Sequence, residues 1–184
     1  MDLIASLATT YDHAASIIDA VKADQLSNTT PCSAWDAQAL IAHTIGVVTN
    51  IGKGASGAEL LPDVNALALE PNLGAQFRTA ASANLSAWKA RGLDGEVNIG
   101  AGPMPAQAGI SINLLDTATH AWDIARATGQ KGDLPEELAA TVYAICQGFV
   151  TDEIRKFAGF DAAISVSDSA SATDRLVAFL GRKP

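Results

Sequence analysis

The stretch from Leu114 to Gly129 constrains the fold of this chain more than any other. It contains no proline, and its only glycine is the last residue, so one helix ending at that glycine is predicted. Successive helical residues are about 100° apart, so Asp116 and His120 lie one turn apart and Asp123 falls on the same stripe. An adjacent apolar face consists of Leu115, Ala118, Trp122 and Ala125. Burying unpaired carboxylates and imidazoles is costly, so the polar stripe needs a compensating partner, and a metal ion completed by a histidine from elsewhere is the leading candidate.

Composition places the chain among folded, soluble domains. Of its 184 residues, 48% are hydrophobic and only 17% are charged, which predicts a single domain over residues 1–184 with a sizeable core. The net charge of −8 argues against nucleic acid or an anionic membrane as a partner. No apolar run is long enough for a membrane span, no basic signal-peptide region is seen, and two cysteines make no disulfide framework. A cytoplasmic location is therefore expected.

Hydrophobic periodicity predicts an all-α bundle. The expected helices cover about 2–22, 34–50, 73–90, 106–128, 134–157 and 173–180. Glycine, serine and proline are frequent from 52 to 71, which predicts a long irregular connection, either a crossover or a lid over a site. The period also changes between 92 and 109, where a short β-hairpin excursion is expected.

The glycine spacing at Gly52–Gly57 formally matches a dinucleotide-binding fingerprint. That fingerprint needs a buried strand before it and a long helix after it. The preceding residues have a helical period, and Pro62 stops any following helix early. A flexible loop is the preferred interpretation of these glycines.

His43 lies on the predicted second helix and supplies the partner that the 114–129 stripe lacks. With Asp116 and His120 it forms a set of two histidines and one carboxylate, which leaves coordination positions open and suits Zn, Ni or Fe(II). The competing interpretation is that both histidines are core residues bonded to carbonyl groups. His13, on the first helix, is expected to face solvent.

Four further residues, Asp123, Arg126, Trp35 and Trp122, are expected around this site or in its pocket, and Cys32 is a fifth candidate. Asp123 either accepts a hydrogen bond from a ligand histidine or pairs with Arg126. Trp35 and Trp122 are expected as core aromatics that can form a pocket wall. Cys32 is either a small apolar residue under a loop or a thiol near the pocket.

Three ordered motifs carry a family resemblance. They are Thr30–Trp35 followed by Leu40–His43, then Asp116–Gly129, and finally Asp174–Pro184. Together they resemble the mycothiol-dependent maleylpyruvate isomerase N-terminal domain family, within the DinB/YfiT-like metal-binding superfamily. The chain is most similar to the small single-domain actinobacterial branch of that superfamily.

The resemblance implies a four-helix bundle with a long crossover, a hairpin excursion and a short C-terminal helix. It also implies a divalent metal near one end, held by His43, Asp116 and His120. The isomerases have a glutamate where this chain has Asp116, which has a shorter reach. They also carry a further C-terminal domain that contributes to their active site and that this sequence does not contain. What the resemblance implies here is therefore the metal site and a thiol co-substrate such as mycothiol.

Three functional hypotheses follow. The first is an enzyme, a metal-dependent thiol transferase or isomerase that presents a low-molecular-weight thiol to a small electrophile. The second is a non-catalytic module that binds metal or a small ligand, with a role in stress or regulation. The third is a structural bundle whose histidines are core residues. The sequence identifies no catalytic base, and it leaves the oligomeric state open, with a homodimer as one option.

Overall fold

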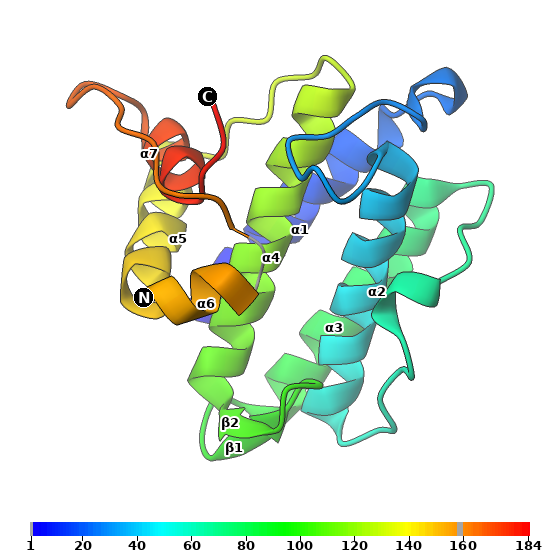
Figure 1. Ribbon diagram of the computed structural model, residues 1–184. Coiled ribbons are helices and arrows are strands. Elements are labelled where there is room, and N and C mark those ends of the chain that lie inside the picture. Colours follow the sequence, from blue (N-terminus) through cyan, green and yellow to red (C-terminus); the bar gives the residue numbers. More distant parts are fainter. Residues whose placement is uncertain (1, 158–159) are drawn as a thin grey trace. The chain divides into compact units, whose positions relative to one another are not determined.

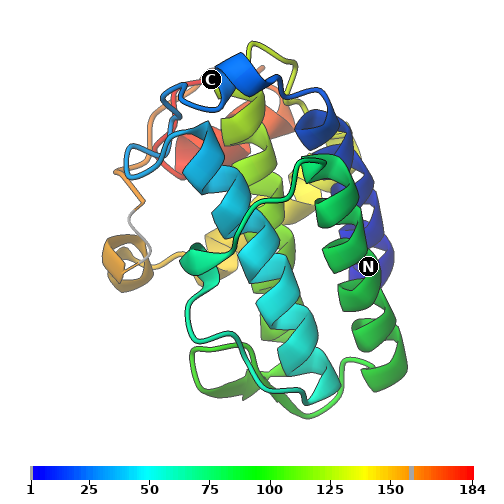
Figure 2. The same ribbon diagram turned by 90° about the vertical axis from the view of Figure 1, so that its right-hand side faces the viewer.

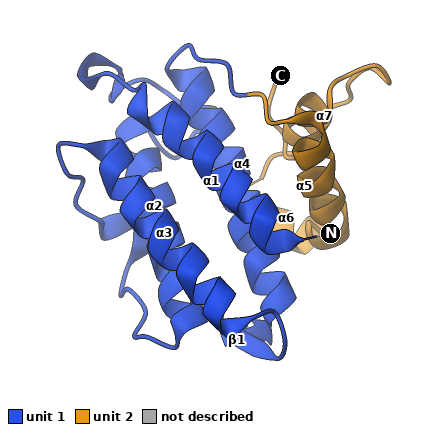
Figure 3. Cartoon of the chain, turned by 180° about the vertical axis from the view of Figure 1, so that it is seen from behind, with its two compact units in different colours: residues 1–132 blue, residues 133–184 orange. Residues whose placement is uncertain are grey.

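The computed structural model describes residues 2–157 and 160–184, and it is mainly helical (Figure 1). The chain divides into two compact units, unit 1 with residues 1–132 and unit 2 with residues 133–184 (Figure 3). Unit 1 contains α1 (Leu3–Asp19), η1 (Ala23–Gln25), α2 (Ala37–Ser56), η2 (Val64–Ala66), α3 (Leu73–Arg91), β1 (Glu96–Asn98), β2 (Pro103–Pro105) and α4 (Ala106–Ala127). Unit 2 contains α5 (Glu136–Phe149), α6 (Asp152–Phe157) and α7 (Ala172–Phe179). Folding as one domain stays a prediction.

Unit 1 is a four-helix bundle, which confirms the predicted fold class. Around the bundle the packing order is α1, α3, α2, α4, and α4 closes the ring on α1. Helices α1 and α4 run in one direction, whereas α2 and α3 run in the other (Figures 1 and 2). Because α2 and α3 are parallel, the chain must return along the whole bundle between them, which is why residues 57–72 form a long crossover.

Side-chain caps begin the helices where the sequence suggests. The Asp2 carboxylate accepts hydrogen bonds from two backbone N–H groups of the first turn of α1. The Asp36 carboxylate caps α2 in the same way, through the N–H of Ala39 at 2.8 Å. The C-terminal end of α4 also lies at the predicted position, just before Gly129, which adopts φ 70°. The cap at Asp36 and the glycine at 129 thus mark the start of α2 and the end of α4, the two helices that carry the candidate ligands.

The prediction of a loop at Gly52–Gly57 was wrong, because α2 continues through most of this stretch. A Cβ at Gly52 would lie 2.9 Å from the Cα of Asn84 in α3. A Cβ at Gly54 would lie 2.2 Å from the carbonyl oxygen of Asn98 in the hairpin. Close helix packing, and not chain flexibility, therefore accounts for Gly52 and Gly54. Because the residues before them are helical, the strand that a dinucleotide-binding fingerprint needs is absent there.

The predicted hairpin is present at the end of the bundle where α3 passes to α4. Strands β1 and β2 pair antiparallel, with Val97 opposite Met104. The guanidinium of Arg91, at the end of α3, donates to the carbonyl groups of Gly92, Asp94 and Glu96. The hairpin is thereby tied to the helix that precedes it.

In unit 2 the single helix predicted over 134–157 is two helices. Val150 leaves the helical conformation at φ −83° and ψ 84°. The hydroxyl of Thr151 then accepts the N–H of Ile154 at 3.2 Å, which is the contact of an N-cap and starts α6. The last helix, α7, packs on α5, as a short C-terminal helix is expected to do. Within the described residues, no helix is long and apolar enough to cross a membrane.

Candidate metal centre

Helices α2 and α4 bring the three predicted ligands together. His43 lies early in α2, while Asp116 lies at the middle of α4 and His120 one turn later. Since the two helices are neighbours and antiparallel, these positions face each other across the bundle. One ligand atom from each residue lies within 4.8 Å of the others. Among the described residues, no fourth histidine, cysteine or acid joins this group.

The atoms that converge are two imidazole nitrogens and one carboxylate oxygen. Asp116 Oδ1 lies 3.7 Å from His43 Nε2 and 3.5 Å from His120 Nε2. The side chains are 20% exposed for Asp116, 13% for His43 and 9% for His120, so the cluster is mostly enclosed but reaches solvent at the carboxylate. Two nitrogens and one oxygen form a donor set that suits Zn, Ni and Fe(II).

His120 is oriented by an acid on its own helix. Its Nδ1 lies 3.3 Å from Oδ2 of Asp123, whose side chain is fully buried. With the Asp123 oxygen as the acceptor, Nδ1 is the donor, and Nε2 is left facing Asp116. The structure thus favours the first of the two interpretations of Asp123, a partner that fixes the tautomer of a ligand histidine.

His43 is oriented by a residue that the sequence did not single out. Its Nδ1 lies 2.7 Å from the amide oxygen of Asn65, in η2 of the crossover. An amide oxygen accepts only, so Nδ1 is again the donor and Nε2 again faces Asp116. Burial lowers the pKa of His43, but the nearby carboxylate of Asp116 and the hydrogen bond to Asn65 outweigh it and raise this pKa above 6.5.

Trp35 packs against both candidate histidines. Its ring stacks on His43, with 4.3 Å between centroids and 25° between planes, and meets His120 edge-on at 6.0 Å. The hydroxyl of Thr30 bonds to the carbonyl of Trp35 and holds the loop that presents this ring. The indole therefore limits rotation of the His43 imidazole and covers it from solvent.

The other predicted residues lie elsewhere. Trp122 follows His120 by two positions, about 200° around α4, and its ring packs under the Arg126 guanidinium at 5.4 Å. Cys32 is half-buried in the loop before α2. His13 is half-buried, so its predicted solvent exposure was wrong, because its neighbours at i−3 and i+4 on α1 are buried core positions.

The arrangement fits a divalent metal on three counts. Three donor atoms of the right type converge, both imidazoles present Nε2, and each Nδ1 has an acceptor. Core histidines bonded to backbone carbonyls, the competing interpretation, would not need a shared carboxylate between them. Sequence reasoning missed Asn65, since Asp63 and Asn65 signal a turn but not what the turn contacts.

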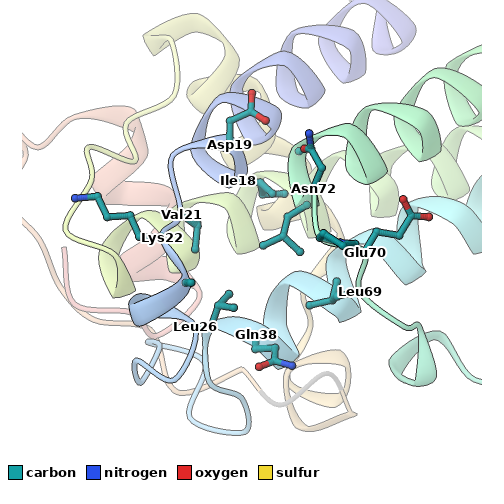
Figure 4. A pocket seen from close by; sticks show the side chains of 13 residues that line it. Ile18, Asp19, Val21, Lys22, Leu26, Gln38, Leu69, Glu70 and Asn72 are labelled. Atoms are coloured by element: carbon teal, nitrogen blue, oxygen red, sulfur yellow. The ribbon is translucent and has the colours of Figure 1, made fainter.

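A pocket of about 520 Å³ lies apart from these ligands (Figure 4). It is formed by the end of α1, the start of α2, the end of the crossover and the start of α3. Its base is apolar, with Ile18, Leu26 and Leu69, and its rim carries Asp19 and Glu70. None of the three candidate ligands lines it, so the metal centre and this pocket are separate features of unit 1.

A family model described as the mycothiol maleylpyruvate isomerase N-terminal domain matches residues 7–125, nearly the whole bundle and all three candidate ligands. The chain belongs to this family. The uncharacterized protein Rv0738 of Mycobacterium tuberculosis strain H37Rv is 32% identical to it, over 99% of this chain and 98% of the relative. The uncharacterized protein MT0763 of Mycobacterium tuberculosis strain CDC 1551 matches to the same extent.

Solved structures share the fold. A crystal structure of the mycothiol-dependent maleylpyruvate isomerase superposes with a TM-score of 0.56 at 18% identity, covering 78% of this chain and 68% of that one. A structure of a histidine-to-alanine mutant of the same isomerase gives a TM-score of 0.55. The membership that the three sequence motifs predict is thereby confirmed at the level of family and fold.

Proposed function

We propose that this protein binds one divalent metal ion through His43, Asp116 and His120 and uses it to activate a low-molecular-weight thiol of the mycothiol type. The thiol would be transferred to, or would isomerise, a small electrophile. The observation that carries the proposal is the convergence of the three ligand atoms within 4.8 Å, with both Nε2 atoms turned to the same carboxylate.

A bound divalent metal with open positions lowers the pKa of a thiol or water that joins it, and so supplies a nucleophile at neutral pH. The chain's residues prepare for this in three ways. Asp123 and Asn65 hold the two imidazole protons on Nδ1, away from the metal. Asp116 offsets part of the metal's charge, and Trp35 keeps water from one side of His43.

Family membership supports a thiol as the co-substrate, since the family is described by mycothiol and by maleylpyruvate isomerisation. The aligned part of the isomerase is 68% of its chain, so the isomerisation itself belongs to the proposal. Zinc is the first choice of metal, with nickel and iron as alternatives, because all three accept two imidazoles and a carboxylate.

The metal is tested by elemental analysis of protein purified without a nickel column. One metal ion per chain is expected for the wild type, and His120→Ala is expected to lose it. Metal well below one per chain, together with unchanged stability of His120→Ala, would contradict the proposal.

Activity is tested by mixing metal-loaded protein with mycothiol, glutathione or cysteine and a panel of electrophiles that includes maleylpyruvate. Turnover that requires both metal and thiol supports the enzyme. The second candidate is a metal-binding module without catalysis, which would need no general base. Stoichiometric metal without turnover for any thiol would select that module.

A further inference from the structure

The crossover between α2 and α3 contributes a side chain to the metal centre. Asn65 comes from η2, an exposed turn more than twenty residues after His43, yet its amide oxygen lies 2.7 Å from the imidazole Nδ1. We propose that Asn65 is a positioning residue, which keeps the proton of His43 on Nδ1 so that Nε2 is presented to the metal. This inference rests on the metal site proposed above and assigns to the crossover a part in building it.

Asn65 is not held against His43 by its own turn. The carboxylate of Asp63 accepts the backbone N–H of Asn65 at 2.8 Å, and this contact already closes the turn. The side chain of Asn65 is therefore not needed for the local backbone. Burial does not force its position either, because Asn65 is exposed. The imidazole is the partner that accounts for where the amide points.

The crossover backbone approaches α2 closely at two further points. The amide oxygen of Asn50 accepts the N–H of Leu61 at 2.8 Å. At Gly46, one turn after His43, a Cβ would lie 2.0 Å from the carbonyl oxygen of Val64. No side chain fits in that space, so Gly46 lets the residue before Asn65 rest directly on the helix. The position of the amide therefore depends on a glycine that touches no ligand atom.

The direct test compares Asn65→Leu with Asn65→Asp by zinc titration of the full chain against a competing chelator. Loss of a hydrogen-bonding partner of a ligand histidine weakens metal binding about 10–100-fold. We expect that loss for Asn65→Leu, while Asn65→Asp keeps an acceptor and binds zinc within about threefold of the wild type or more tightly. Wild-type affinity in Asn65→Leu would overturn the inference.

A matched control separates positioning from stability. Asn72 is also an exposed asparagine, but its amide oxygen accepts the backbone N–H of Ala75 in the first turn of α3 and lies away from the candidate ligands. Asn72→Leu is expected to lower the unfolding midpoint in urea while leaving the zinc affinity unchanged. Equal loss of zinc affinity in Asn72→Leu and Asn65→Leu would show that Asn65 acts only through stability and would overturn the inference.

The second test uses two glycines of the same helix. Gly46→Ala would push the Val64 carbonyl, and Asn65 with it, away from α2. Gly54→Ala meets the carbonyl of Asn98 at 2.2 Å, a clash of the same kind at the hairpin. We expect both to destabilise the fold, but only Gly46→Ala to weaken zinc binding, by about the same factor as Asn65→Leu. Equal zinc affinity in the two alanine variants would count against the inference.

A readout without metal keeps the inference separate from the proposed function. The ¹⁵N chemical shifts of the His43 ring report which nitrogen carries the proton. In metal-free wild type, at a pH above the raised pKa of His43 where the ring is neutral, we expect the proton on Nδ1, and in Asn65→Leu a shift toward Nε2. If the wild type binds no zinc but this shift occurs, the proposed function fails while the hydrogen-bonding role of Asn65 stands. If zinc binds and the tautomer ignores Asn65, the positioning role fails alone.

Discussion

Both histidines of the candidate centre turn Nε2 toward Asp116, but one is held by a residue of its own helix and the other by a residue distant in the sequence. His120 is held by Asp123, three residues further along the same helix, through a fully buried carboxylate. His43 is held by Asn65, through a neutral amide on an exposed crossover. The α4 half of the site is therefore present as soon as α4 forms, whereas the α2 half requires the crossover to dock. In such a site, two candidate ligands are placed by a single helix, whereas the third depends on tertiary packing.

The largest expected effect comes from removing a ligand on the preformed side. Structural zinc sites bind with about 10–16 kcal/mol, so one ligand of three or four contributes roughly 3–4 kcal/mol, which is more than about 100-fold in affinity. His120→Ala is expected to lose at least that much, as measured by zinc titration. If His120→Ala bound zinc as tightly as the wild type does, His120 would not be a metal ligand.

The next effect tests the charge on the α4 side. Asp123→Asn keeps an acceptor for His120 but removes the buried negative charge, so we expect zinc affinity to fall about tenfold. Asp12→Asn, at an exposed acid of α1, serves as the control and should leave zinc affinity unchanged. An unchanged affinity in Asp123→Asn would mean that the carboxylate and the amide are equivalent supports, and the contrast between the two histidines would disappear.

The pH dependence tests the α2 side. The pKa of His43 is raised above 6.5, and zinc requires the neutral imidazole. Zinc affinity is therefore expected to fall as pH drops through that raised pKa, by about tenfold per pH unit below it for this one ligand. His43→Gln should remove this part of the pH dependence, and an identical pH profile in His43→Gln would contradict the assignment.

In metal-free protein the pH dependence of stability has the opposite sign, so that stability falls as the pH rises. A raised pKa means that the folded state binds the proton more tightly than the unfolded state does. The resulting stability is fully present below the unfolded pKa of about 6.5 and is lost as pH rises through the folded pKa. Urea unfolding with and without zinc, each compared with His43→Gln, should show this reversal. The same slope in both states would contradict it.

The smallest effect concerns the aromatic wall. Stacked rings contribute about 0.5–1.5 kcal/mol beyond the area that they bury, so Trp35→Leu is expected to cost about that much in the free energy of unfolding. Zinc affinity should change no more than about threefold, because Trp35 contributes no ligand atom. Trp35→Phe, which keeps a ring over His43, should lose less in urea unfolding. A larger loss of zinc affinity in Trp35→Leu than in Asp123→Asn would make the wall more important than the buried acid.

Much of the fold could be predicted from local patterns. The helical periods predict α1, α3 and α4 to within a few residues, because an amphipathic helix repeats its apolar face along the sequence. Asp2 and Gly129 mark helix ends through contacts within a few residues of themselves. The same locality explains why the stripe of Asp116, His120 and Asp123 could be placed on one face of one helix. The cytoplasmic location and the homodimer stay predictions.

The sequence by itself determined the helix that carries two candidate ligands and the acid beside one of them, since these residues are related by the geometry of a single helix. Only the tertiary structure decided that Asn65 meets His43, that Gly46 lets the crossover approach, and that Gly52 and Gly54 belong to a helix. The physical reason is that periodicity shows which residues share a face. It does not show which distant segment will pack against that face, because that choice depends on the summed packing of the whole bundle.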